Sequence, residues 1–177
     1  MGQMPFAMNL DDPGSNAFIS INAGSLSFFP LQVYESVSFN TLNMIVYHNA
    51  TQKTLSYYIG LYSLNGSTLS LANTVSATFT HPNNANVGRY ISFSNTSATQ
   101  NITPGTWWVG FLASTAGSNN ISLRGANNQN PSNAFPGAFY GGAMTASTNA
   151  LPASIATSDL DITGSDAIAV PFICISA

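Results

Sequence analysis

The sequence predicts an all-β protein, a single antiparallel β-sandwich of the jelly-roll type with about nine strands. Apolar residues recur at every second position in several runs, which is the period of a β-strand. Turn signals separate these runs at the short spacing that is typical of sandwiches. Only 5% of the 177 residues are charged. Solubility must therefore come from Asn, Ser, Thr and Gly, which are weak helix formers and suit strands and loops.

The low charge also excludes some classes of partner. The chain has three basic and six acidic residues and a net charge of −3. Its cations, Lys53, Arg89 and Arg124, are far apart in sequence, so we expect no nucleic-acid binding. No apolar run approaches the roughly 20 residues that a membrane span requires, so we expect no membrane insertion. Residues 1–5 show neither a basic start nor a hydrophobic block, and we expect no signal peptide.

The chain divides into an extended N-terminal arm, residues 1–16, and one β-sandwich domain, residues 17–177. The arm ends in the turn sequence Asp-Asp-Pro-Gly-Ser. A first strand starts near Phe18 and a second contains residues 26–29. We expect Pro30 to end the pairing of this second strand, because proline cannot donate a hydrogen bond to a sheet.

The middle of the chain carries the clearest strand patterns. Apolar and polar residues alternate over 37–47 and again over 55–64. Asn65-Gly66 then precedes a third alternating run, 69–79. Asn-Gly between two such runs predicts a hairpin, because both central residues of a type I′ turn need a positive φ.

Residues 101–115 are predicted to form the central strand, and short strands are expected before it, at 89–94, and after it, at 121–124. Its apolar residues lie on both faces of a period-two pattern. A strand of this kind belongs in the middle of a packed sheet. One face would carry Trp107, Val109, Phe111 and Ala113, and the other Trp108 and Leu112.

The segment 125–167 has a different character. It is rich in Gly, Ala, Asn and Ser and reads as a long loop, which is uncommon inside a compact domain unless it is functional or packed by its own aromatics. Within it, residues 155–161 are compatible with a helical turn. The apolar run 167–176 predicts a C-terminal strand that is tied into the sheet.

Two stretches carry a resemblance to known proteins. They are residues 61–69 and 102–108, and Thr-Pro-Gly-Thr-Trp at 103–107 resembles the start of a strand in jelly-roll carbohydrate-binding modules. Residues 17–124, which are poor in charge, and the apolar stretch 170–173 together resemble phage virion proteins, especially distal domains of tail fibres and receptor-binding proteins. The resemblance implies a virion module, often trimeric, that serves in attachment or in cementing a shell. No coiled-coil or collagen-like shaft is seen before the domain, which favours a fibre tip or a decoration protein over a complete fibre.

The residues that hydrolytic enzymes need are not brought together by any sequence motif. The chain has two histidines, His48 and His81, both in predicted loops, and no Gly-x-Ser-x-Gly elbow. Four of the six acidic residues fall in two local turn clusters, and Glu35 has no obvious partner. We expect a protein without enzymatic activity.

One acidic cluster is compatible with calcium. Asp159, Asp161 and Asp166 lie within eight residues around a glycine, and calcium prefers such oxygen ligands. The spacing departs from the EF-hand loop, and aspartates also commonly cap turns. Both interpretations stay open, and no other cofactor is expected.

Aromatic and amide side chains are the candidates for ligand contact. Trp107 and Trp108 are neighbours on a strand and must point to opposite faces, and Tyr57 and Tyr58 pose the same alternative. One of each pair would be core, whereas the other would face solvent, a seam between subunits or a sugar ring. Packing within the sandwich or between copies is the simpler reading. The candidate ligand-binding residues are Trp108, Tyr58, His81, Asn83, Asn84, Phe135, Phe139 and Tyr140.

These observations favour a non-enzymatic phage structural protein in the virion, a tail-fibre or receptor-binding tip that contacts the host surface. A capsid decoration (cement) protein is the alternative, and a carbohydrate-binding module the third. The expected partners are copies of itself in a homotrimer, other virion proteins and a host-surface glycan. The loops 81–87 and 125–142 would carry the contact, because binding residues concentrate on loops that a rigid scaffold holds.

Overall fold

The computed structural model describes residues 17–22, 24–48, 53–81, 89–94, 99–114, 120–127, 142–145, 150–160, 169–171 and 173–176. Most of these residues are in β-strands and none is in an α-helix, which confirms the predicted all-β class. The elements are β1 Ala17–Asn22, β2 Ser25–Val33, β3 Val37–Phe39, β4 Thr41–His48, β5 Lys53–Asn65, β6 Thr68–His81, β7 Arg89–Ser94, β8 Gln100–Ile102, β9 Gly105–Ala113, β10 Asn120–Asn127, β11 Gly142–Thr145, β12 Ser154–Ala156, the 3₁₀ turn η1 Thr157–Asp159, β13 Ala169–Pro171 and β14 Ile173–Ser176.

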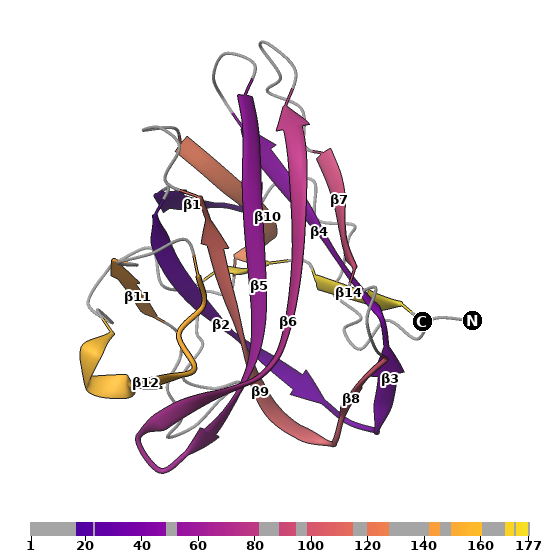
Figure 1. The fold of residues 1–177 in the computed structure, drawn as a ribbon, viewed down its shortest axis with the longest axis vertical. Helices are drawn as coiled ribbons and strands as arrows, with labels where there is room; N and C mark the ends of the chain where they lie inside the picture. Colours follow the sequence, from indigo (N-terminus) through magenta and orange to yellow (C-terminus); the bar gives the residue numbers. More distant parts are fainter. Residues whose placement is uncertain are drawn as a thin grey trace.

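Twelve of the fourteen described strands join one antiparallel sheet, which curls into a half-barrel (Figure 1). The strand order is β1-β10-β4-β7-β6-β5-β9-β2-β11, and β12, β13 and β14 add to β6, β10 and β4. Strands β3 and β8 pair separately. The joint between β7 and β6 is narrow, since its register consists of the single pair Ser76↔Ser94. The count exceeds the predicted nine, because strands of three or four residues are too short to show a period of two.

The curl encloses the main hydrophobic core, here called the inner core. Side chains reach it from strands on both sides of the curl, including Met44 of β4, Phe93 of β7 and Ile59 of β5. Tyr57 of β5 lies among them, with its ring 6.2 Å from that of Phe93 and 5.7 Å from that of Phe111. Each of these five side chains is essentially inaccessible to water. Burial on this scale is the main stabilising contribution to the fold.

Strand β9 is buried on both faces, as its sequence predicted. It lies between β5 and β2 in the sheet. Val109, Phe111 and Ala113 face the inner core, whereas Trp108 and Leu112 face the opposite side. The alternation in the sequence therefore predicted both the strand and its position.

A second, smaller cluster lies on the outer face of the sheet and is called the outer core. Residues 150–160, called the strap, cover it with Ile155 and Leu160. Main-chain hydrogen bonds fasten the strap to β6 and to the turn before it, from Leu71 N to Ala153 O at 2.9 Å and from Thr157 N to Ser67 O at 2.8 Å. The outer core consists of Leu26, Phe28, Tyr62, Leu69, Trp108, Leu112, Ile155 and Leu160.

Two paired glycines let the outer core approach the sheet closely. Gly60 of β5 lies opposite Gly110 of β9, and the ring of Tyr62 lies beside both. A methyl group on Gly60 would lie 2.7 Å from Cε2 of Tyr62, and one on Gly110 would lie 2.8 Å from the same atom. The ring of Phe28 packs edge-on against the ring of Tyr62, and the two ring centroids are 5.1 Å apart. Residues with side chains would not fit at either position.

The long loop predicted over 125–167 contains ordered elements among its described residues. β10 extends to Asn127, β11 pairs with β2, and β12 pairs with β6. The predicted helical turn at 155–161 is a 3₁₀ turn restricted to Thr157–Asp159. The predicted C-terminal strand is divided into β13 and β14, which pair with β10 and β4.

Pro30 does not end its strand, contrary to expectation. It lies inside β2, opposite Trp108 of β9. On the other edge of β2, the described partner β11 reaches only as far as Phe28. Pro30 therefore lies past the described end of β11, and proline is tolerated in strands at positions whose N–H would face away from a paired neighbour.

The predicted β5–β6 hairpin is present, with its turn displaced by one residue. Asn65 and Thr68 form the closing pair, so the two central residues are Gly66 and Ser67. Gly66 has a φ of +59°. A two-residue hairpin turn of the primed types needs a positive φ at its first central position, and glycine provides it without strain.

Candidate binding face

The tryptophan proposed for ligand contact is in the interior. Trp108 is 1% exposed and packs in the outer core, so its ring offers no face to a sugar. This corrects the expectation for Trp108, and the reason is that the strap covers the outer face of β9. Trp107 points to the inner side and is half-buried, and its Nε1 donates a hydrogen bond to Thr103 O at 2.9 Å.

The tyrosine pair resolves into one buried and one accessible ring. Tyr57 is buried in the inner core, whereas Tyr58 points outward and is half-buried at the margin of the outer core. Tyr58 is thus the accessible aromatic among the predicted ligand residues that the structure describes. His81 ends β6, and its side chain is outside the described part. The other candidates, Asn83, Asn84, Phe135, Phe139 and Tyr140, also lie outside the described residues.

The candidate calcium ligands are described only in part. Asp159 is exposed at the end of η1, and its Oδ1 accepts a hydrogen bond from Ser158 Oγ at 3.4 Å. Asp161 and Asp166 lie outside the described residues. Within the described ranges, no three His, Cys, Asp or Glu side chains come together to hold a metal. Calcium binding at residues 159–166 stays a prediction.

Between the start of β5 and Gly60, and along the facing part of β6, the outward side chains carry hydroxyl groups. Figure 1 shows the two strands side by side along the long axis of the molecule. Their outward residues form three cross-strand pairs, in which Thr54 faces Thr80, Ser56 faces Thr78 and Tyr58 faces Ser76. All six are exposed or half-buried. We call Thr54, Ser56, Tyr58, Ser76, Thr78 and Thr80 the hydroxyl face.

Two of the three pairs are joined by side-chain hydrogen bonds. The hydroxyl oxygens of Thr54 and Thr80 are 2.7 Å apart, and those of Ser56 and Thr78 are 3.1 Å apart. Strand β9 supports Ser56 from the other edge, because Ser114 N donates to Ser56 O at 2.8 Å and Ser56 N donates to Ser114 Oγ at 3.1 Å. The hydroxyl groups are therefore held on a rigid part of the sheet.

The sequence contained a signal for this face that motif searching missed. In residues 74–80, polar residues alternate with Val75, Ala77 and Phe79, all of which contact the inner core. Alternation alone indicates that one face of the strand is exposed to solvent. The register with β5 shows in addition that two rows of hydroxyl groups stand opposite each other.

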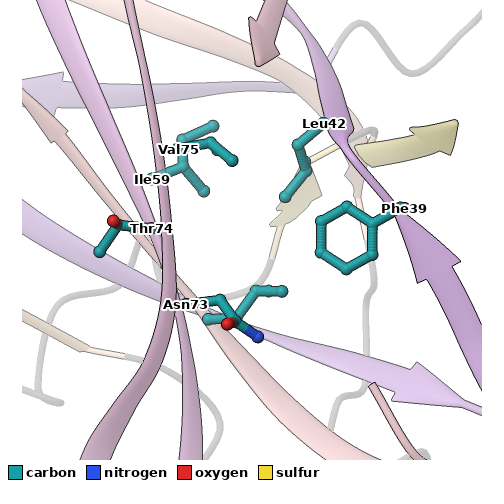
Figure 2. Close-up of a pocket in the computed structure, with 7 residues that line it drawn as sticks. Phe39, Leu42, Ile59, Asn73, Thr74 and Val75 are labelled. Atoms are coloured by element: carbon teal, nitrogen blue, oxygen red, sulfur yellow. The ribbon is translucent and has the colours of Figure 1, made fainter. Parts of the chain in front are cut away.

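The pocket shown in Figure 2 is a gap in the inner core and not a ligand site. Phe39 and Leu42 approach it from one side, and Ile59, Val75 and Asn73 from the other. It is partly open to solvent and has no room for a water molecule. A ligand would have to push these core side chains apart, at a cost in packing.

Large apolar side chains are rarely exposed in the described residues. Tyr34 is 74% exposed and Leu64 is 36% exposed, and they are the exposed large hydrophobic residues among those whose side chains the structure describes. Most of the exposed residues in the described part of the chain are polar and uncharged. None of the helices in the described part of the chain has the length and apolar character that crossing a membrane requires.

Comparison with known proteins adds no identity. No family model matches the sequence, and no curated protein shows significant similarity to it.

Proposed function

We propose that the chain is a non-enzymatic structural protein of a phage particle, a tail-fibre or receptor-binding tip that contacts a glycan on the host surface. The observation that carries this proposal is an accessible, uncharged, hydroxyl-bearing sheet surface on a rigid scaffold. Such a surface suits a ligand that is itself neutral and rich in hydroxyl groups. The charge-poor composition and the resemblance of residues 17–124 to virion proteins support a place in a particle.

The finer architecture belongs to the same proposal. We infer a jelly roll, in which β1, β10, β4 and β7 form one layer and β2, β9, β5 and β6 the other. The strand order supports this arrangement, since each layer is continuous in the sheet and the two meet at the single pair Ser76↔Ser94. The inner core is filled from both groups of strands. Jelly rolls of eight strands are common in viral capsid and lectin domains.

The absence of enzymatic activity is proposed from the sequence. Two histidines and six acidic residues are available in the whole chain, and no nucleophile motif accompanies them. The neutral hydroxyl face needs no such groups, because reversible binding uses hydrogen bonds and ring contacts alone.

A homotrimer is the proposed assembly, with other virion proteins as further partners. The few exposed apolar side chains in the described residues indicate that contacts made there would be mainly polar. Polar contacts are usual in interfaces that assemble from stable folded subunits.

The proposed function is tested by light scattering after size exclusion at several concentrations, followed by a glycan array. A trimer whose mass does not change with concentration, together with glycan binding, is the expected result. A monomer that binds no glycan but sediments with empty capsids would overturn the proposal in favour of a decoration protein. A monomer that binds glycans would identify a carbohydrate-binding module instead.

A further inference from the structure

We propose that the hydroxyl face is the glycan-binding site itself and that it selects neutral saccharides over acidic ones. This inference rests on the proposed function in attachment and names the site and the class of ligand. It places one sugar ring against Tyr58 and the following sugar units along the pairs Ser56–Thr78 and Thr54–Thr80. Neither half of this assignment follows from the resemblance to virion proteins.

The hydroxyl pairs match the chemistry of sugar hydroxyl groups. A hydroxyl group donates one hydrogen bond and accepts others. When Thr54 and Thr80 bond to each other, one of their two protons is used, and the other proton stays available together with lone pairs on both oxygens. The same holds for Ser56 and Thr78. Each pair therefore offers both a donor and acceptors, as a sugar hydroxyl requires of its partner.

Tyr58 supplies the apolar contact that a sugar ring requires. It stands opposite Ser76, at the boundary between the outer core and the hydroxyl face. Its half-buried ring is held against the outer core, so little side-chain freedom is lost when a ligand binds. The apolar C–H groups of a sugar ring can rest on such an aromatic face while its hydroxyl groups reach the neighbouring pairs.

The spacing suits a short extended oligosaccharide. Successive outward residues of a strand are about 6.6–6.8 Å apart, so the three pairs span about 13–14 Å. This length accommodates a few sugar units lying along β5 and β6. A ligand of this shape would contact all three pairs at once, so several individually weak hydrogen bonds would form together.

The selection for neutral ligands follows from the charges. All six residues of the hydroxyl face are uncharged. A carboxylate or sulfate group placed on it would lose part of its hydration without gaining a cationic partner among these six residues, which is unfavourable. A neutral glycan loses only hydroxyl hydration, which the hydroxyl pairs replace.

The test is affinity electrophoresis of the full chain in gels that contain soluble glucan, mannan or galactan, with polygalacturonate as the acidic counterpart of galactan. We expect retardation by at least one neutral polysaccharide and none by polygalacturonate. Tyr58→Ala should weaken this binding at least tenfold, and Thr78→Val, which keeps the shape of the side chain and removes its hydroxyl, several-fold. Tyr34→Ala and Ser38→Ala alter exposed residues outside the face and should bind as the wild type does. Thermal unfolding shows whether each variant is folded.

The possible failures are distinguishable. If the wild type binds a neutral polysaccharide and Tyr58→Ala and Thr78→Val bind it equally well, the site assignment is wrong and the proposed function stands. If the wild type binds only polygalacturonate, the neutral class is wrong and attachment to glycans again stands. If it binds none of these and no spot of a glycan array, both this inference and the proposed glycan attachment are overturned.

Discussion

Tyr62 donates a hydrogen bond from its phenol oxygen to the main-chain oxygen of Pro152, 90 residues further along the chain, at 3.0 Å. Tyr62 belongs to β5, in the middle of the sheet, and Pro152 belongs to the strap. The bond therefore fixes the strap over the outer core at the point where the ring of Tyr62 lies beside Gly60 and Gly110. One side chain thus links the sheet, the paired glycines and the strap.

Replacing the Tyr62 hydroxyl should loosen the strap without emptying the outer core. Tyr62→Phe keeps the ring and removes the donor to Pro152 O, so we expect the free energy of unfolding to fall by about 0.5–1.5 kcal/mol. Urea denaturation measures this change. Tyr34→Phe, at a tyrosine that is 74% exposed, is the matched control and should have no measurable effect. Equal stability of Tyr62→Phe and the wild type would show that the bond contributes nothing.

The paired glycines should not tolerate side chains. Gly60→Ala places a methyl group 2.7 Å from both Tyr62 Cε2 and Leu71 Cδ1, so we expect a loss of about 1–3 kcal/mol of stability from overpacking. The loss should be smaller when Tyr62→Leu is already present, because the rigid ring is then absent. A double-mutant cycle measures this coupling. Strict additivity would contradict the account, since it would mean that the methyl group and the ring do not meet.

The hairpin turn depends on backbone conformation and not on space. Nothing lies within 4 Å of a methyl group placed on Gly66, whose φ is +59°. Gly66→Ala should therefore cost about 1–2 kcal/mol through the left-handed backbone alone. Gly66→Asn should cost less, because asparagine tolerates this region. If both variants were equally destabilised in thermal unfolding, the backbone would not be the cause.

Stability should fall at high pH because of two buried tyrosines. Burial raises the pKa of Tyr57 and of Tyr62 above the ordinary value of 10.0. Above about pH 10 the unfolded chain loses these protons while the folded chain keeps them, so unfolding becomes more favourable as the pH rises. Below about pH 9 the two states hold the same tyrosine protons, and this contribution to stability is complete and constant.

The slope of this decline can be assigned to individual residues. Each buried tyrosine contributes up to about 1.4 kcal/mol per pH unit, so Tyr62→Phe should flatten the dependence of unfolding free energy on pH by one such contribution. Urea denaturation between pH 8 and 11.5 measures it. An unchanged slope in Tyr62→Phe would contradict the assignment.

The elements that the sequence predicted correctly are those whose pattern is local and long. β5 and β9 each alternate over nine residues or more, and in both the two faces of the strand contact the two cores. A period of two over that length is difficult to mimic by any other structure. The all-β class and the buried position of β9 followed from it.

The elements that the sequence did not predict depend on partners distant in the chain. Whether β2 can continue through Pro30 depends on how far β11 extends along β2. The burial of Trp108 depends on the strap. β12 has three residues, which is too few for any periodic pattern. The hydroxyl face was not predicted for the same reason, since its pairs depend on the register that places Thr54 opposite Thr80.

The sheet order also fixes when the parts of the chain can become stable during synthesis. β1 pairs with β10, beginning with Ala17 opposite Gly125, and β2 pairs with β9. The β5–β6 hairpin can form as soon as it is made, whereas Phe29 and Leu31 have their β9 partners, Val109 and Trp107, 80 and 76 residues further along the chain. Pairing at such distances makes folding slow, on the scale of milliseconds to seconds. Strands β1 and β2 therefore stay without these partners for longer than the β5–β6 hairpin does, and their apolar residues are exposed to aggregation during that time.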